Sequence, residues 1–405
     1  MAAAGLGYAE GGVLAPLGFL GAAVSAGLKK SGKRDVALIV AEKRSPAAAV
    51  FTRNTMAAAP VIVSREHALD GHARAIVVNA GNANACTGEQ GLADARAMAE
   101  AAAAALSCDV REVLVASTGV IGVPLPIEQV RAGIAEAAEQ LDIITGDAVA
   151  EAIMTTDTFP KQIAVRAEVE GRVYTVGGVA KGSGMIRPDM ATMLAFLTTD
   201  APLDPKACEV VLRAAVSRTF NRLTVDSDTS TNDMCALIAS GAAGGPAIAH
   251  DDARFVAVAA AVEHVAGELA RMIARDGEGA TKLVTVTVTG ARDEADAERA
   301  AFAIAESPLV KTAIFGGDAN WGRVAMAIGK SGASLDPARV RIEFAGVLTC
   351  ENGTAVPFSE EEAARALAEP EVQVLADLGV GAASATVWTC DLTYEYVRIN
   401  GEYRS

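Results

Sequence analysis

Hydrophobic positions in the first quarter of the chain fall into short runs that are separated by turns. The runs cover residues 36–42, 47–54, 59–66 and 73–81, and their lengths and their small and β-branched residues are typical of strands. An alanine-rich segment follows over 89–106, where the composition favours a helix. The pattern therefore predicts several strands and then a helix.

Strand and helix patterns alternate through the middle of the chain. A strand is expected over 113–122, and helices are expected over 126–141 and 147–154. Two more strands lead up to residue 181. An uninterrupted apolar run over 191–197 then predicts another strand, which is buried.

The last third of the chain has a βαβ-like rhythm, which we interpret as a second, smaller lobe over 284–405. Amphipathic helices over 204–219 and 249–275 come before it. The elements expected from there on are a strand over 281–291, a helix over 293–306, an apolar run over 308–315, a helix over 321–330, a strand over 339–346, a helix over 359–378 and a long strand over 386–400.

The acidic composition argues against two classes of partner. The chain carries a formal net charge of −15 over 405 residues, and the acidic residues are spread along it. Nucleic acids and anionic membranes attract basic surfaces, so neither is an expected partner. No apolar run reaches the roughly 18 residues that a membrane-spanning helix needs.

Cysteine usage and the first residues indicate a cytoplasmic protein. The 6 cysteines lie far apart without a CxxC pair, as is typical of thiols in a reducing compartment. Residues 13–28 come nearest to a secretory signal. Such a signal needs a basic segment before its apolar run, whereas here the acidic Glu10 precedes it, so we predict no secretory signal.

Thr192 is the first candidate for chemistry, because it begins a buried strand directly after the turn-forming segment 181–190. Its hydroxyl could attack the carbonyl carbon of Ala191 to form an ester, and hydrolysis would leave Thr192 at a new N-terminus. The freed α-amine, with a pKa of about 7.7–8.0, could then serve as a base beside the hydroxyl. An ordinary β-branched strand residue is the alternative interpretation.

Small and polar residues after other strands and helices are further candidates. Ser117-Thr118-Gly119 follows a strand, where backbone N–H groups can converge on an oxyanion, although by itself such a sequence is more often a simple turn. The hydroxyl-rich segment 154–161 can cap a helix or contact a ligand. The asparagine-rich segment 79–88 is either a hydrogen-bonded turn or the wall of a pocket.

Several familiar kinds of site find no support in the sequence. The 4 histidines lie in no motif, which disfavours a Ser-His-Asp enzyme or a zinc site. No glycine-rich phosphate motif follows a strand, so we predict no nucleotide cofactor, and residues 315–323 lack the lysine of a P-loop and are interpreted as a turn. Asp226, Asp228 and Asp233 do not have the spacing of an EF-hand, so we expect a hydrogen-bonded loop there and no metal.

The segment over 181–201, KGSGMIRPDMATMLAFLTTDA, closely resembles the self-cleavage site of the ornithine acetyltransferases, the bifunctional glutamate N-acetyltransferases of arginine biosynthesis. In that family the chain breaks before the threonine of the Ala-Thr-Met-Leu sequence. Two positions differ: the family commonly has Asn at the position of Asp189, and the position of Arg187 is variable. Neither difference affects the Ala191–Thr192 pair.

The resemblance spans nearly the full length and implies a fold and an assembly. The implied fold is a four-layer α/β/β/α sandwich of the α/β class with a smaller C-terminal α/β lobe. Self-cleavage would give an alpha chain over 1–191 and a beta chain whose first part, 192–283, completes the sandwich and the site. Residues 284–405 would form the smaller lobe, with its end returning to the pocket. Two alpha and two beta chains would assemble as a heterotetramer.

The resemblance also implies an activity and a set of site residues. The acetyl group of N2-acetylornithine would move to glutamate through an acetyl-Thr192 intermediate, and use of acetyl-CoA as a second donor is left open. The implied roles are an oxyanion hole at Thr118 and Gly119, cleavage between Ala191 and Thr192, and substrate contacts at Thr155, Lys181, Thr192, Glu278, Asn400 and Ser405.

Two other functions remain possible from the sequence. One is an aminopeptidase or amidase that has the same N-terminal nucleophile and uses water in place of glutamate. The other is an uncleaved ligand-binding protein with a vestigial site. The complete Ala191–Thr192 pair and the intact hydroxyl groups count against the second of these.

Overall fold

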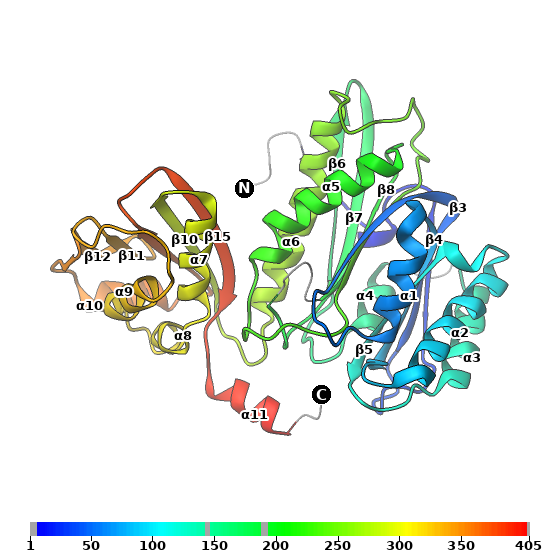
Figure 1. Cartoon of the computed structure of the whole chain (residues 1–405), viewed down its shortest axis with the longest axis horizontal. Helices are drawn as coiled ribbons and strands as arrows, with labels where there is room; N and C mark the ends of the chain where they lie inside the picture. Colours follow the sequence, from blue (N-terminus) through cyan, green and yellow to red (C-terminus); the bar gives the residue numbers. More distant parts are fainter. Residues whose placement is uncertain (1–5, 142–145, 188–192, 403–405) are drawn as a thin grey trace.

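The protein consists of two unequal lobes that lie side by side (Figure 1). The structure is a computed structural model that describes residues 6–141, 146–187 and 193–402. Over these ranges the larger lobe contains a 9-stranded sheet system, and the smaller lobe contains a 6-stranded sheet. None of the helices described is both long enough and apolar enough to cross a membrane.

The strands of the larger lobe form two layers that share strand β3. The first half of β3 pairs with β2 and β4, and its second half pairs with β9, with a register shift between Val40 and Ser45. The strands of the first layer are β2 (Phe19–Val24), the start of β3 (Val36–Phe51), β4 (His72–Asn82) and β5 (Val113–Val120); those of the second are β1 (Leu6–Ala9), β6 (Lys161–Val169), β7 (Arg172–Lys181), β8 (Leu194–Thr199) and β9 (Met234–Ala239).

Helices cover the outer faces of both layers and complete the α/β/β/α sandwich that was expected. Separate buried clusters fill the spaces between successive layers. The helices over the first layer are α1 (Ala59–His67), α2 (Gly88–Leu106) and α3 (Ile127–Glu139), those over the second are α5 (Pro205–Arg218) and α6 (Phe255–Arg275), and α4 (Gly146–Ile153) packs into the cluster between the two sheets.

Strand β8 shows why this architecture requires an uninterrupted apolar run. Successive side chains of a strand point to opposite faces of the sheet. Leu194 and Phe196 belong to the cluster between the two sheets, whereas Ala195 and Leu197 belong to the cluster under α5 and α6. Both faces of the strand are therefore buried, as the sequence predicts.

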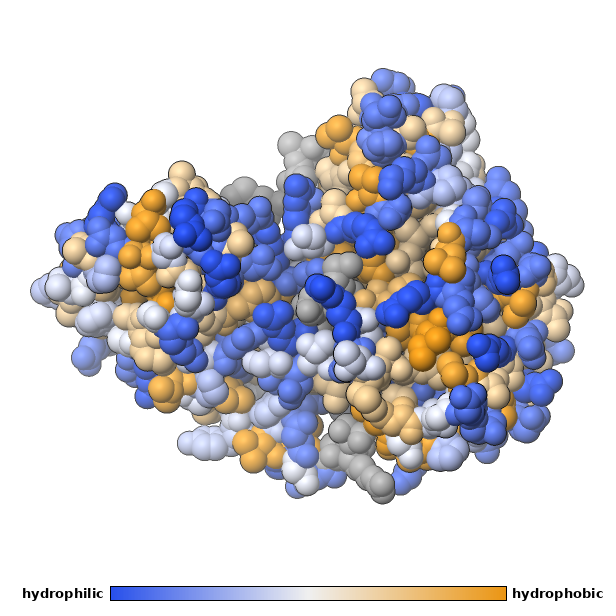
Figure 2. All heavy atoms as spheres, viewed as in Figure 1, coloured by the Kyte–Doolittle hydropathy of each residue, from blue (hydrophilic) through white to orange (hydrophobic). Residues whose placement is uncertain are grey.

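The smaller lobe has its own sheet, helices and buried cluster. Its final helix, α11, extends away from this sheet and lies below the space between the two lobes in Figure 1. On the face shown in Figure 2, hydrophilic side chains cover much of both lobes between scattered hydrophobic patches. The elements are β10 (Leu283–Ala291), α7 (Glu294–Ala305), α8 (Pro308–Phe315), α9 (Trp321–Gly329), β11 (Arg341–Phe344), β12 (Val347–Glu351), β13 (Thr354–Ala355), α10 (Glu360–Leu367), β14 (Glu371–Asp377), β15 (Ala383–Cys390) and α11 (Tyr394–Glu402).

Three of the predicted elements are wrong in the structure. The run over 59–66 is helix α1, with a proline in its first turn, where the missing N–H costs nothing. The helix expected over 359–378 divides at Pro370 into α10 and β14, because proline cannot continue the helical hydrogen bonds. The strand expected over 386–400 ends at Cys390, and Thr393 then accepts a hydrogen bond from the Glu395 N–H at the start of α11.

Candidate functional site

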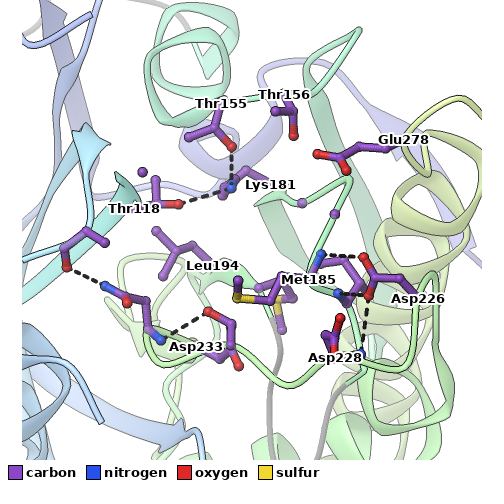
Figure 3. Close-up of a pocket in the computed structure, with 18 of the residues that line it drawn as sticks. Thr118, Thr155, Thr156, Lys181, Met185, Leu194, Asp226, Asp228, Asp233 and Glu278 are labelled. Carbon is purple, nitrogen blue, oxygen red and sulfur yellow. Dashed lines mark hydrogen bonds between the residues drawn. The ribbon is translucent and has the colours of Figure 1, made fainter. Parts of the chain in front are cut away.

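A cavity of about 230 Å³ lies where the two sheets of the larger lobe approach helix α11, and Figure 3 shows the residues around it. Met193 and Leu194, which directly follow Thr192 in the sequence, line it. Ala191, Thr192 and Ser405 themselves lie outside the described residues. The structure brings the other predicted site residues together on the cavity wall: Thr118, Gly119, Thr155, Lys181, Glu278 and Asn400.

These side chains come from elements that are far apart in the sequence. Thr118 and Gly119 lie near the end of β5, and Lys181 is the last residue of β7. Thr155 follows α4 and Glu278 follows α6. Because the ends of β5 and β7 approach the start of β8 at one edge of the sandwich, residues from both sheets face a single cavity.

Lys181 is the cationic centre of the cavity. Its Nζ donates hydrogen bonds to Thr118 Oγ1 at 3.1 Å and to Thr155 Oγ1 at 2.7 Å (Figure 3). Burial lowers the pKa of Lys181, and the negative charge of Asp157 opposes that shift. An ammonium group has three donors, so one N–H remains to bind an anionic group such as a carboxylate.

Carboxylates line the opposite side of the cavity. Figure 3 shows Glu278 and Asp226 across from Thr118, with Asp228 below them. Asn400 Nδ2, in helix α11, donates a hydrogen bond to Glu278 Oε2 at 2.8 Å. A cation on one side and carboxylates on the other suit a ligand that carries both a carboxylate and an amine.

Asp226 fixes the backbone that precedes the cavity-lining strand β8. Its carboxylate accepts hydrogen bonds from the Met185 N–H at 2.7 Å and from the Ile186 N–H at 2.8 Å. Burial raises the pKa of Asp226, and these hydrogen bonds oppose the shift. Across the three described ranges, no group of three or more His, Cys, Asp and Glu side chains is arranged to bind a metal ion.

Position 119 requires glycine because the backbone of β4 lies too close to leave room for a side chain. Gly119 has φ +134°, a backbone conformation that residues with a Cβ rarely adopt. A Cβ there would collide with backbone atoms of Gly81 and Asn82. The parallel pairing of β4 with β5 thus places a residue without a side chain beside Thr118 on the cavity wall.

Both interpretations of the asparagine-rich segment apply, to different residues. The Asn79 amide donates a hydrogen bond to the carbonyl group of Asn82, and Asn82 Oδ1 accepts a hydrogen bond from the Asn84 N–H. These side chains are therefore used in the turn itself. Ala83 lines the cavity, so the same turn also supplies part of its wall.

Sequence reasoning missed a buried group of charges under the cavity. Lys161 Nζ lies 2.6 Å from Asp157 Oδ1 and 2.5 Å from Asp276 Oδ2, and all three side chains are almost completely buried. Asp157 also accepts hydrogen bonds from the backbone N–H groups of Thr155 and Gly182. The spacing of Asp157 and Lys161 indicates one helical turn or a tight loop, but nothing in the sequence indicates that Asp276 joins them.

Asp233 is a further buried carboxyl, and the sequence pattern did not distinguish it from the other aspartates of its loop. It lines the cavity at the start of β9 and is 2% exposed. Burial raises the pKa of Asp233 well above its usual range, although hydrogen bonds from Ser230 and the charge of Lys181 act in the opposite direction. A carboxyl with a raised pKa is favoured in its neutral form.

Replacing Asp157 with asparagine is expected to destabilise the protein by about 3–5 kcal/mol at neutral pH, because Lys161 loses a buried partner. Burial alone would raise the pKa of Asp157, but the charges of Lys161 and Lys181 outweigh it and hold the pKa below the ordinary 3.8. Such a carboxyl stabilises the fold above its unfolded pKa and loses that effect as the pH falls through its folded pKa.

The difference in the free energy of unfolding between wild type and Asp157→Asn should therefore become smaller below about pH 4. Urea unfolding at pH 7 and at pH 3 would measure it. Asp70→Asn is the matched control, because Asp70 pairs with Arg44 at an exposed position. This substitution should lower the free energy of unfolding by no more than about 1 kcal/mol. Equal effects of the two substitutions would contradict the role given to the buried charges.

The chain is similar along almost its whole length to proteins of one family. The model of the ArgJ family matches residues 21–405. Proteins named "Arginine biosynthesis bifunctional protein ArgJ" match from Symbiobacterium thermophilum, with 53% identity over 98% of this chain and 100% of the relative, and from Caldanaerobacter subterraneus, with 49% identity over 98% and 99%. A crystal structure of the ArgJ protein of Bacillus halodurans matches with a TM-score of 0.50 and 44% identity over 51% of this chain and 98% of that chain.

Proposed function

The chain belongs to the ArgJ family, and we propose that it transfers the acetyl group of N2-acetylornithine to glutamate through an acetyl-Thr192 intermediate. It is an acetyltransferase of arginine biosynthesis. One observation carries the detailed proposal: Lys181 and Glu278 line one cavity with Met193, the residue after the proposed nucleophile. The roles of the individual residues are our assignment.

The first step is self-cleavage between Ala191 and Thr192. The Thr192 Oγ forms a bond to the carbonyl carbon of Ala191 while the C–N bond breaks, and the hydroxyl proton passes to the nitrogen. Water then hydrolyses the ester, so that Ala191 gains a carboxylate and Thr192 regains its hydroxyl group. The product carries a nucleophile and a base on one residue.

Acetyl transfer follows in two half-reactions. The α-amine of Thr192 takes the hydroxyl proton while Oγ attacks the acetyl carbonyl carbon, and Thr118 and Gly119 stabilise the oxyanion. The C–N bond of acetylornithine breaks, its nitrogen takes up the proton, and ornithine leaves. The α-amine of glutamate then attacks the acetyl ester, and acetylglutamate departs as the Thr192 hydroxyl re-forms.

The charges of the cavity bind the α-carboxylate that both substrates share and the side-chain amine that only the ornithine group carries. Acetylornithine and glutamate each carry an α-carboxylate, which Lys181 binds through its remaining N–H. Glu278, fixed by Asn400, binds the free amine of the ornithine side chain. Thr155 supports the site by accepting a hydrogen bond from Lys181, and Ser405 is a further proposed contact.

We also propose that two alpha and two beta chains form the enzyme in the cytoplasm. The solved Bacillus halodurans chain corresponds to 51% of this chain although 98% of its own length is matched, which supports an enzyme of two polypeptides. Size-exclusion chromatography with light scattering would measure the assembly.

Incubation with N2-acetylornithine alone is expected to add one acetyl group to the beta chain and none to the alpha chain, as mass spectrometry of the denatured protein would show. Added glutamate should remove the label and yield acetylglutamate. Because ornithine leaves before glutamate binds, double-reciprocal plots should be parallel. kcat/KM should fall in acid as the Thr192 α-amine is protonated, near its reference pKa of about 7.7–8.0.

The amidase alternative predicts a different result from the same incubation. Acetylornithine would then be hydrolysed at a rate that glutamate does not change, and no acetylglutamate would form. An unlabelled beta chain combined with active transfer would rule out the covalent intermediate. Glutamine in place of glutamate is a suitable control, since it keeps the α-amino-acid group but lacks the side-chain carboxylate.

A further inference from the structure

Arg187 connects the segment that precedes the cleavage site to the smaller lobe. Its Nε lies 2.6 Å from Oε1 of Glu306, the residue that directly follows helix α7. Its guanidinium carbon lies 4.0 Å from the centre of the Phe302 ring, within α7. The Arg187 and Glu306 side chains are 30% and 28% exposed, so solvent only partly screens their attraction. The contact therefore joins two lobes through an ion pair and a stacked ring.

The backbone beside Arg187 is also fixed, by groups of the larger lobe. Asp226 accepts the N–H groups of Met185 and Ile186, and the Val225 N–H donates to the Ile186 carbonyl oxygen at 2.7 Å. The Thr229 hydroxyl donates to the carbonyl oxygen of Arg187 at 2.9 Å. Residues 185–187 are thus bound through both backbone and side chain.

The strand that follows the cleavage site is fixed as well. The Met193 carbonyl oxygen accepts a hydrogen bond from the Met234 N–H at 3.0 Å, and β8 pairs with both β7 and β9. In sequence, the Ala191–Thr192 bond therefore stands between two anchored points, residues 187 and 193.

We propose that Arg187 is a positioning residue for self-cleavage, and that Glu306 and Phe302 of the smaller lobe act through it. The inference rests on the proposed cleavage at Ala191–Thr192. Intramolecular attack depends strongly on how the reacting atoms are placed, and a displacement of about 1 Å can cost on the order of 10²-fold in rate. Arg187 is the last described residue before the cleavage site, so its contacts restrain the chain at the nearest described point on that side.

Arginine suits this role better than lysine would. Its planar guanidinium group can pair with a carboxylate and stack on an aromatic ring at the same time, whereas the ammonium of lysine is a point charge. After cleavage Arg187 belongs to the alpha chain and Glu306 to the beta chain. The same contacts therefore also join the two products.

The test follows the cleavage of freshly translated chains over time on denaturing gels. Arg187→Ala is expected to slow cleavage about 10- to 100-fold, and Arg187→Lys should recover part of that loss because it keeps the charge. Glu306→Gln should slow cleavage less than Arg187→Ala. The double variant should cleave no more slowly than Arg187→Ala, since the two residues act through one contact.

Glu371→Gln is the matched control, because Glu371 of β14 also joins the lobes, through Arg271 of α6 at 3.0 Å. It should cleave at the wild-type rate. The inference is overturned if Arg187→Ala and Glu306→Gln cleave normally, or if Glu371→Gln is as slow as Glu306→Gln. A wild-type chain that never cleaves would instead overturn the proposed function on which the inference rests.

Discussion

Thr192→Ala is expected to remain a single chain of 41.3 kDa, whereas the wild type should divide into two polypeptides, the second of which begins at Thr192. Alanine has no hydroxyl group to attack the Ala191 carbonyl carbon, so neither the ester nor the free α-amine can form. Acetyl transfer should fall by roughly 10⁴-fold or more, because nucleophile and base disappear together. Denaturing mass spectrometry and N-terminal sequencing would measure the cleavage.

Thr192→Ser is the control for the hydroxyl group. Serine keeps the nucleophilic oxygen and loses one methyl group, so this variant should still cleave, and its new N-terminus should still accept acetyl from acetylornithine. Cleavage of Thr192→Ala at the same bond would show that another group breaks the chain. A wild-type protein that stays intact in active preparations would show that the uncut chain is the enzyme.

Local patterns were sufficient to predict most elements of the sandwich. The alanine-rich helix expected over 89–106 is α2, which begins one residue earlier, and the strand expected over 73–81 lies within β4. Helix α2 buries a regular apolar face and strand β4 buries an uninterrupted apolar run. In both elements, burial and the intrinsic propensity of the residues favour the same secondary structure. The family resemblance, rather than periodicity, supplied the number of layers and their order.

Long-range pairing explains what the sequence patterns missed. The runs over 36–42 and 47–54 appear as two strands in the sequence, but the single strand β3 continues from the first into the second and ends at Phe51, because it pairs with β4 in one layer and with β9 in the other. Strand β9 itself follows a polar loop and was not predicted as a separate element. Only the partners of these residues determine that they lie in sheets.

The candidate site likewise contains residues that the sequence could predict and residues that it could not. Thr118 and Lys181 could be proposed because they stand in recognisable sequences, and the structure brings their side chains within 3.1 Å of each other. The contact between Lys161 and Asp276 joins residues 115 positions apart, so no local pattern could reveal it. Buried charges of this kind become visible only when the fold is known.

The second large effect is expected from the Thr118 hydroxyl group. Thr118 Oγ1 accepts a hydrogen bond from Lys181, which leaves its own proton to be donated to an oxyanion in the cavity. Removing one donor from an oxyanion hole typically lowers kcat by about 10²–10³-fold. Thr118→Ala should therefore lower kcat for acetyl transfer by up to that factor. KM should change much less, because the oxyanion develops only in the transition state.

Two variants separate this effect from a general disturbance of the cavity. Thr118→Ser keeps the hydroxyl group and should retain most of the wild-type kcat. Thr156→Ala removes a hydroxyl group from the same cavity wall, at a position to which we assign no part in the reaction, and should change kcat little. Steady-state kinetics with acetylornithine and glutamate would measure all three variants. If Thr118→Ala turned over at the wild-type rate, the role of Ser117-Thr118-Gly119 at the end of strand β5 would be structural, and the oxyanion would have to be stabilised by other groups.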